Sequence, residues 1–215
     1  MSTPRLRAHN ISISTDGFMA GPHQDEANPL GVRGTTLHEW VFKTATFGAS
    51  HISDGTETGV DDDFARAGED RIGATLMGRN MFGPVRGPWP DETWRGWWGE
   101  EPPFHHPVVV LTHHARAPLA LTGTTFHFCT DGLAAGVALA KDLAGDRDVR
   151  VGGGASTIRQ LLGIRELDEL HLAVVPVLLG SGERVFDDLD AIADAYTVTD
   201  VTPGERVTHV RIARR

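Results

Sequence analysis

The chain contains a single cysteine, Cys129, which excludes any disulfide within it. That residue ends an alternating apolar stretch, residues 126–129, a pattern typical of a buried and unreactive thiol. Basic residues are few, 20 against 29 acidic ones, and the net charge of -9 argues against nucleic acid as a partner, because nucleic acid binds basic faces. No apolar run approaches the roughly 18 residues of a membrane span, and no signal peptide opens the chain. We therefore expect a cytoplasmic protein that does not enter a membrane.

Motifs of several common enzyme classes are missing as well. Neither G-x-G-x-x-G nor G-x-x-x-x-G-K-[ST] occurs, which excludes the usual Rossmann and P-loop nucleotide sites. The chain has 11 histidines but no H-E-x-x-H motif, and the adjacent pairs at 105–106 and 113–114 would point to opposite faces of an extended strand. We therefore expect no metal site. A nucleophilic serine is not indicated either, because no G-x-S-x-G motif occurs.

Strand patterns alternate with helical patterns along most of the chain, which indicates a sheet covered by helices. The end of the chain differs, because residues 195–201 and 206–213 predict a hairpin around Pro203 and Gly204. We expect one α/β domain over residues 1–215, with three layers: a mostly parallel central sheet, flanking helices and an antiparallel C-terminal hairpin. The other predicted strands are residues 5–14, 72–77, 107–112, 124–129, 149–151 and 170–179, and the predicted helices are 35–45, 64–70, 133–143 and 158–162.

Residues 82–107 are rich in proline and tryptophan and show no periodicity. A long stretch of this kind is typical of a functional lid or a binding loop. Two alternatives fit equally well: a hydrophobic cluster folded over the core, or a contact between subunits.

The run Val-Gly-Gly-Gly-Ala-Ser-Thr at residues 151–157 stands between a strand and a helical pattern. Its glycines let a ligand approach the backbone, and the following helix directs free N–H groups at an anion. A plain strand-to-helix connection without a ligand would use the same residues. Gly78-Arg79-Asn80 and Thr112-His113-His114 also follow predicted strands, so three loops should meet at the edge where open α/β sheets bind ligands. Arg79 suits a phosphate held by two hydrogen bonds, although a surface arginine paired with a carboxylate is the simpler alternative.

These motifs, in this order, resemble the dihydrofolate-reductase-like superfamily, and within it the stand-alone relatives of the riboflavin-biosynthesis reductase domain. The segments that carry the resemblance span nearly the whole chain: 14–21 (STDGFMAG), 76–82 (LMGRNMF), 110–113 (VLTH), 151–155 (VGGGA), 167–170 (LDEL) and 176–182 (PVLLGSG), with Phe186 beyond.

The resemblance implies an NADPH-dependent reductase that passes hydride to a C=N or C=O bond of a small heterocycle, a pterin or a pyrimidine. It places Arg79 near the 2′-phosphate or pyrophosphate, Thr112 at the adenosine end, and the glycine turn under the pyrophosphate, across a cis Gly-Gly bond. Arg116 and His113 are further partners suited to the extra phosphate. The cofactor-binding residues expected in this way are Ala20, Gly21, Gly78, Arg79, Asn80, Leu111, Thr112, His113, Gly152, Gly153, Gly154, Ala155 and Ser156.

The sequence departs from both familiar groups of this superfamily near the substrate. Riboflavin reductases usually carry Asp-Gly-Lys in the first motif and Glu-Gly-Gly in the glycine turn, where this chain has Phe18 and Gly152. We therefore expect the ribosylated pyrimidine of riboflavin synthesis to be a poor substrate. Dihydrofolate reductases carry an acidic residue one turn before a phenylalanine of the first helix, and His38 takes that position here, four residues before Phe42. His38 is our first candidate for the proton donor, because an ordinary histidine pKa near 6.5 suits this role, and Glu39 is the second.

Two other interpretations remain open. The same phosphate-binding loops would serve a dinucleotide-binding module without turnover. The tryptophan-rich segment could alternatively act only in association, and together with the apolar stretch 172–177 it predicts a homodimer.

Overall fold

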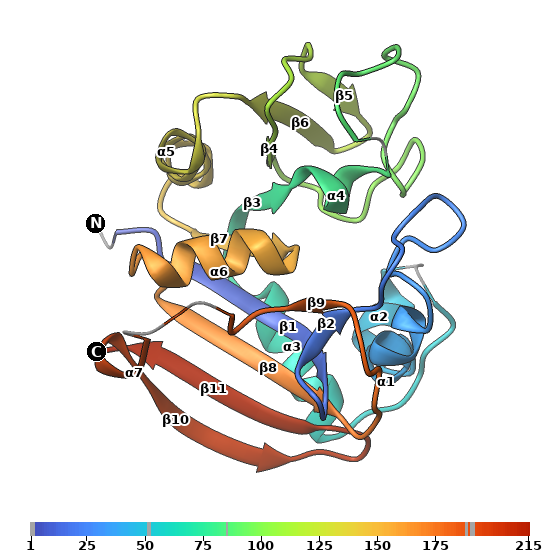
Figure 1. The fold of residues 1–215 in the computed structure, drawn as a ribbon, viewed down its shortest axis with the longest axis vertical. Coiled ribbons are helices and arrows are strands. Elements are labelled where there is room, and N and C mark those ends of the chain that lie inside the picture. Colours follow the sequence, from blue (N-terminus) through green and yellow to red (C-terminus); the bar gives the residue numbers. More distant parts are fainter. Residues whose placement is uncertain (1–2, 51–52, 85, 188, 190–191) are drawn as a thin grey trace.

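A 9-stranded sheet forms the centre of the molecule (Figure 1). The computed structural model describes residues 3–50, 53–84, 86–187, 189 and 192–215. The strand order is β10-β11-β8-β1-β7-β3-β4-β6-β5; neighbours from β8 to β6 are parallel, and β10, β11 and β5 are antiparallel to their neighbours. The strands are β1 (Leu6–Ser14), β3 (Ile72–Gly78), β4 (Val108–Leu111), β5 (Leu119–Leu121), β6 (Thr124–Cys129), β7 (Asp148–Gly153), β8 (Glu169–Val175), β10 (Tyr196–Pro203) and β11 (Thr208–Arg214).

Helices cover both faces of the sheet, so the predicted three-layer α/β architecture with its C-terminal hairpin is confirmed. One face packs against α5 (Leu133–Ala144) and α6 (Ala155–Gly163), and the other packs against α3 (Val60–Glu69) and α1 (Glu39–Phe42) (Figure 1). No described helix is long and apolar enough to span a bilayer. The remaining elements are a 3-10 helix (Gly34–His38), α2 (Ala45–Ala49), α4 (Arg79–Phe82), α7 (Ile192–Ala195) and a small sheet of β2 (Phe18–Ala20) with β9 (Glu183–Arg184).

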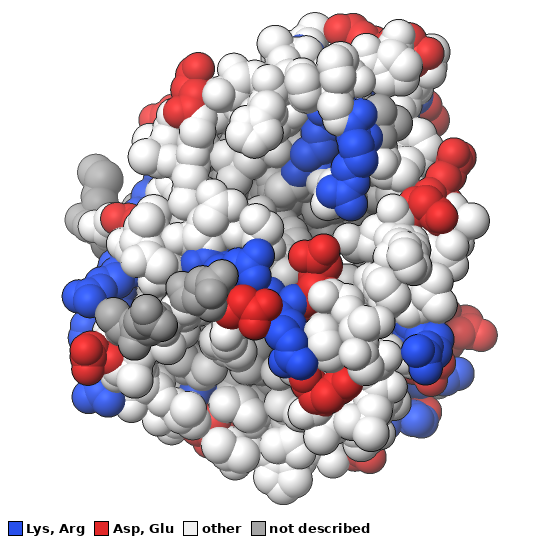
Figure 2. Space-filling view, viewed as in Figure 1, with Lys and Arg blue, Asp and Glu red and all other residues white. Residues whose placement is uncertain are grey.

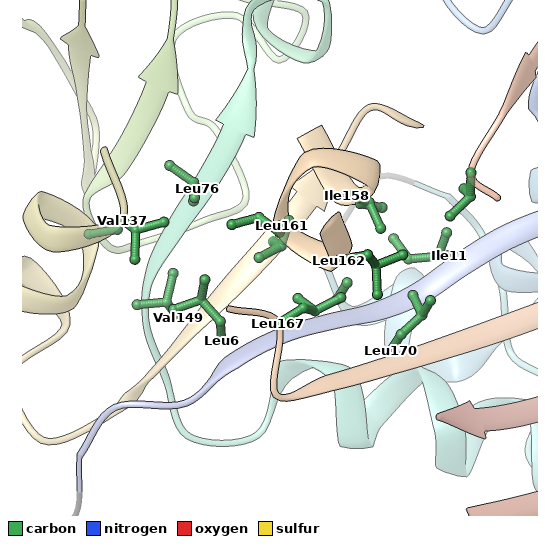
Figure 3. Close-up of a cluster of buried hydrophobic side chains, with 14 of the residues drawn as sticks. Leu6, Ile11, Leu76, Val137, Val149, Ile158, Leu161, Leu162, Leu167 and Leu170 are labelled. Carbon is green, nitrogen blue, oxygen red and sulfur yellow. The ribbon is translucent and has the colours of Figure 1, made fainter. Parts of the chain in front are cut away.

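The central strand β1 contains a bulge at Asn10, where φ is 58°. Leu6 and Ala8 before the bulge and Ile11 and Ile13 after it belong to the same apolar cluster, beneath α5 and α6 (Figure 3). A strict alternation would have turned one of the two pairs to the other face. The bulge inserts one extra residue, which keeps both pairs in the core. Asn10 itself does not follow the alternation of the strand.

The predicted helix over 35–45 is broken into three short helices. Thr44 separates the last two: its backbone is extended, and its side-chain oxygen accepts the Phe47 N–H at 3.3 Å, as an N-cap does. The predicted strand 170–179 ends at Val175 because Pro176 follows, and proline has no N–H to donate to a ladder.

The proline- and tryptophan-rich segment packs over the sheet. Trp89, Trp94 and Trp98 lie against a third apolar cluster, around Phe82 and Phe126. This packing agrees with one of the alternatives above, a hydrophobic cluster folded over the core. Val85 of this segment lies outside the described residues.

Strand β8 gives no support to the predicted homodimer. It lies between β1 and β11, and Leu172 and Ala173 are buried within one chain. The expectation that this stretch needs a partner subunit to cover it was therefore wrong, and the homodimer stays a prediction.

Candidate functional site

A cleft of about 1110 Å³ lies where β1, β7, β3 and β4 end, between the α3 and α1 side of the molecule and the tryptophan-rich segment. Figure 2 shows the molecule hollowed between α6 and α4, with basic side chains on the α4 side of the hollow. The three predicted loops do meet in it, since Gly78, Thr112 and Gly152 all line its wall. The parallel strands bring these loops together because they all end at the same edge of the sheet.

The glycine turn connects β7 to α6 and forms one wall of the cleft. The Gly153–Gly154 peptide is cis, as the resemblance implies. Gly153 has a φ of 110°, which side chains rarely tolerate. A Cβ on Gly154 would meet no atom within 4 Å, so the cleft is open at that point. Helix α6 starts there without a side-chain cap; the Thr157 N–H donates to the Gly154 carbonyl oxygen, and the N–H groups of Ala155 and Ser156 before it are available to an anion.

The structure brings most of the expected cofactor-binding residues to the cleft and leaves two of them out. Gly21 packs against backbone instead, because a Cβ there would lie 2.1 Å from the Val32 carbonyl oxygen. Gly153 lies behind Met19, whose terminal carbon would be 3.0 Å from an added Cβ. The expected residues that do line the cleft are Ala20, Gly78, Arg79, Asn80, Leu111, Thr112, His113, Gly152, Gly154, Ala155 and Ser156.

Arg79 is held in a defined position on the cleft wall. The centre of its guanidinium lies 3.4 Å above the Trp89 ring, and its Nη1 donates a hydrogen bond to Thr112 Oγ1 at 3.4 Å. Its Nε and Nη2 are buried without a protein partner. Burial, followed by the nearby charge of Arg116, lowers the pKa of Arg79. The alternative of an arginine paired with a carboxylate does not apply among the residues that the structure describes, because no ion pair includes Arg79 there.

Arg116 does not line the cleft, contrary to its expected contact with a phosphate. Its Nη2 donates hydrogen bonds to the carbonyl oxygens of Glu92 and Trp94, at 2.8 and 2.6 Å. Arg116 is buried and fixes the tryptophan-rich segment to the loop after β4.

The two candidate proton donors lie in different surroundings. His38 lines the cleft and packs against Phe42, with 6.2 Å between ring centroids. Burial lowers the pKa of His38 below its ordinary value of 6.5, so the expected pKa near neutrality is wrong and the imidazole is neutral at pH 7. Glu39 is exposed and does not line the cleft, so its position gives no support to a role in proton transfer.

Asp16 joins the first and last of the sequence segments that carry the family resemblance, 14–21 and 176–182. Its carboxylate accepts the N–H groups of Leu179 and Gly180, at 3.1 and 2.7 Å, and the Ser14 hydroxyl. The Ser14 hydrogen bond, with these backbone contacts, lowers the pKa of Asp16 to about 2. Phe18 in the same segment is buried under Arg184 and does not line the cleft. The replacement of the usual lysine by Phe18 therefore affects the packing of this loop and does not change the cleft wall.

The end of the cleft remote from α6 was not predicted from the sequence. Aromatic side chains form part of its walls: Phe42 and Phe47 from α1 and α2, and Trp97, Trp98 and Phe104 from the tryptophan-rich segment. They come from distant segments, so no local pattern connects them, although both tryptophans belong to the segment that lacked periodicity. His9, Asn10 and the ion pair of Arg150 with Glu69 also line this end, and the bulge in β1 brings Asn10 there.

This sheet, with its cleft at the carboxyl ends of the strands, is the dihydrofolate-reductase-like fold. The chain belongs to the family of the RibD C-terminal domain, whose model matches residues 8–205. No curated protein matches the sequence.

Solved structures agree on the fold at low sequence identity. A protein from Shewanella sp. PV-4 with a proposed role in riboflavin biosynthesis has a TM-score of 0.58 at 19% identity, over 100% of this chain and 99% of that one. Dihydrofolate reductase from Enterococcus faecalis, complexed with NADP(H) and RAB-propyl, has a TM-score of 0.54 at 14% identity, covering 99% and 97%. RibD from Acinetobacter baumannii has a TM-score of 0.55 at 16% identity, over 99% of this chain but 58% of that one.

Proposed function

We propose that the protein is an NADPH-dependent reductase that passes hydride to a C=N or C=O bond of a small planar heterocycle. One observation carries the proposal: the same cleft is lined by a glycine turn, an uncapped helix start and an arginine that has no ionic partner among the described residues. Each of these suits a phosphate group. A dinucleotide carries phosphates at two places, and the cleft offers basic or N–H-rich walls at two places.

The residues present fit this cofactor. The pyrophosphate would be held by the glycine turn and the first turn of α6, where Gly154 leaves open space. The extra phosphate of NADPH would be held by Arg79. When bound, the cofactor supplies the hydride, and the protein supplies position and a proton.

The aromatic end of the cleft would hold the substrate. Phe42 and Trp98 both line it, and flat aromatic walls favour a planar ring. His38, beside Phe42, is the group through which we propose that the proton reaches the substrate. Because burial lowers the pKa of His38, protonation and turnover should rise as the pH falls below 6.5.

The substrate itself is a pterin- or pyrimidine-like ring in our proposal, and the ribosylated pyrimidine of riboflavin synthesis is a poor one. The support is the missing acidic residue at Gly152, which lines the cleft. A cytoplasmic location and a homodimer are part of the same proposal.

Two alanine variants test the cofactor site. Gly154→Ala places a methyl group in the open part of the cleft, and Gly163→Ala, at the other end of α6, places one against Leu189 at 3.8 Å, an ordinary contact. We expect the first change to weaken NADPH binding at least about 10-fold, or about 1.4 kcal/mol, and the second to leave it nearly unchanged. Equal effects would show that the turn is only a connection. NADPH binding without consumption, with pterin and pyrimidine acceptors present, would favour a dinucleotide-binding module.

A further inference from the structure

We propose that Trp89 is the residue that makes the cleft selective for a dinucleotide with a phosphate on its adenosine ribose, because it holds the Arg79 guanidinium in place. The inference rests on the proposed function and adds a positioning residue to it. Trp89 comes from the proline-rich segment, and neither its type nor its spacing in the sequence indicated a role at the cofactor site.

The Trp89 ring is fixed on its edges and presents a face to Arg79. Its indole Nε1 donates a hydrogen bond to the His114 carbonyl oxygen at 2.9 Å. It also makes T-shaped contacts with the rings of Phe82 and Phe128, at 6.0 and 5.5 Å between centroids. The guanidinium of Arg79 lies 3.4 Å above the ring centre, the distance of direct stacking. A side chain with this many restraints cannot turn away, so it fixes the plane of the guanidinium as well.

No ion pair includes Arg79 in the part of the chain that the structure describes. Arg116 is also near the ring, with 5.0 Å from its guanidinium to the centroid, and the carboxylates of Asp91 and Glu92 raise its pKa. The charge that acts on Arg79, by contrast, is that of Arg116, which lowers the pKa of Arg79. The Arg79 guanidinium is therefore a fixed cation that a phosphate dianion can neutralise, and a ribose hydroxyl cannot.

A second cavity, of about 450 Å³, lies beside Trp89 and confines the phosphate to the Arg79 side. Asp91 and Glu92 line this cavity together with His113 and His114. Two carboxylates repel a phosphate at close range. The Trp89 ring thus stands between an acidic cavity and a basic wall of the cleft.

The experiment compares Trp89→Leu and Trp89→Phe with the wild type, by titration with NADPH and NADH. We expect Trp89→Leu to weaken NADPH binding about 10-fold and to leave NADH binding unchanged. The KM for NADPH should rise with kcat nearly constant, because the guanidinium acts far from the transferred hydride. Trp89→Phe keeps an aromatic face and should restore most of the preference.

Trp94→Leu is the matched control. Trp94 packs in the same apolar cluster and donates its Nε1 to the Phe82 carbonyl oxygen at 3.0 Å, without contact to Arg79. It should cost stability and leave the NADPH-to-NADH ratio unchanged. Adenosine 2′,5′-bisphosphate and adenosine 5′-monophosphate repeat the comparison without any hydride transfer.

Each outcome decides between the two proposals. If the wild type prefers NADPH and Trp89→Leu keeps that preference, or loses affinity for both cofactors equally, the role of Trp89 is overturned and the proposed function stands. If the wild type binds neither NADPH nor NADH, both proposals fail.

Discussion

Acid should destabilise this protein through two histidines buried between α3 and the sheet. His171 and His209 are completely inaccessible and stack on Phe64, at 4.8 and 4.0 Å. The backbone N–H of Asn10 donates to His171 Nδ1 at 3.1 Å. An N–H can only donate, so His171 carries its proton on Nε2 and donates to His209 Nδ1 at 3.0 Å; His209 Nε2 then donates to Asp61 at 2.9 Å. The chain of hydrogen bonds holds both rings neutral.

A proton added to the Nδ1 atom of either ring would face another N–H group, so two donors would meet without an acceptor. Burial, followed by the charges of His9 and His209, lowers the pKa of His171 to about 2. Burial also lowers the pKa of His209, against the hydrogen bond that it donates to Asp61, which raises it. In the unfolded chain both rings titrate at 6.5. Below pH 6.5 the unfolded chain therefore binds protons that the folded chain does not. The free energy of unfolding decreases as the pH is lowered.

The magnitude follows from that difference. At pH 5.5, one unit below the unfolded pKa, each histidine that stays neutral in the fold costs about 1.4 kcal/mol. His209, whose pKa is also lowered, adds to this loss in the same direction, and a domain typically has 5–15 kcal/mol of stability in all. The loss begins as the pH falls through 6.5 and grows towards the folded pKa of His171, about 2; the part above pH 5.5 comes before ordinary carboxylates titrate.

Urea unfolding followed by circular dichroism at pH 7.5, 6.5 and 5.5 measures this loss. His171→Gln should reduce the difference in unfolding free energy between pH 7.5 and 5.5 by about 1.4 kcal/mol. This holds even if the change lowers stability at both pH values. The exposed His113, changed to Gln, should leave the difference intact. Equal unfolding free energies at pH 7.5 and 5.5 in the wild type would refute the argument, and so would a His171→Gln protein with the full difference.

Three further predictions concern activity and assembly. His38→Gln should keep NADPH affinity, lower turnover by roughly 10² to 10⁴, and remove the rise in rate below pH 6.5. If the variant keeps the wild-type rate, His38 is not the proton donor and bound water takes that role. The ribosylated pyrimidine of riboflavin synthesis should turn over far below roughly 1 per second, which a coupled NADPH assay measures, and a faster rate would contradict our interpretation of Gly152. Sedimentation at micromolar concentration should give about twice the chain mass of 23.2 kDa, and a mass near 23.2 kDa would exclude the homodimer.

The sequence alone determined the layers of the fold and the loops of the cleft. The apolar run 107–112 predicted a parallel strand, because a strand that is buried on both faces is apolar at nearly every position. The sequence was enough to predict that Gly78, Thr112 and Gly152 lie close together, because parallel strands end at one edge of the sheet.

Tertiary structure decided what sequence periodicity cannot encode. The bulge at Asn10 and the break at Thr44 depend on packing across the sheet and on a local cap, and neither changes the overall apolar pattern. The pKa of His38 depends on burial by segments distant in the sequence. The contact between Arg79 and Trp89 joins the end of β3 to a segment without periodicity, so only the folded chain shows which aromatic ring holds that guanidinium.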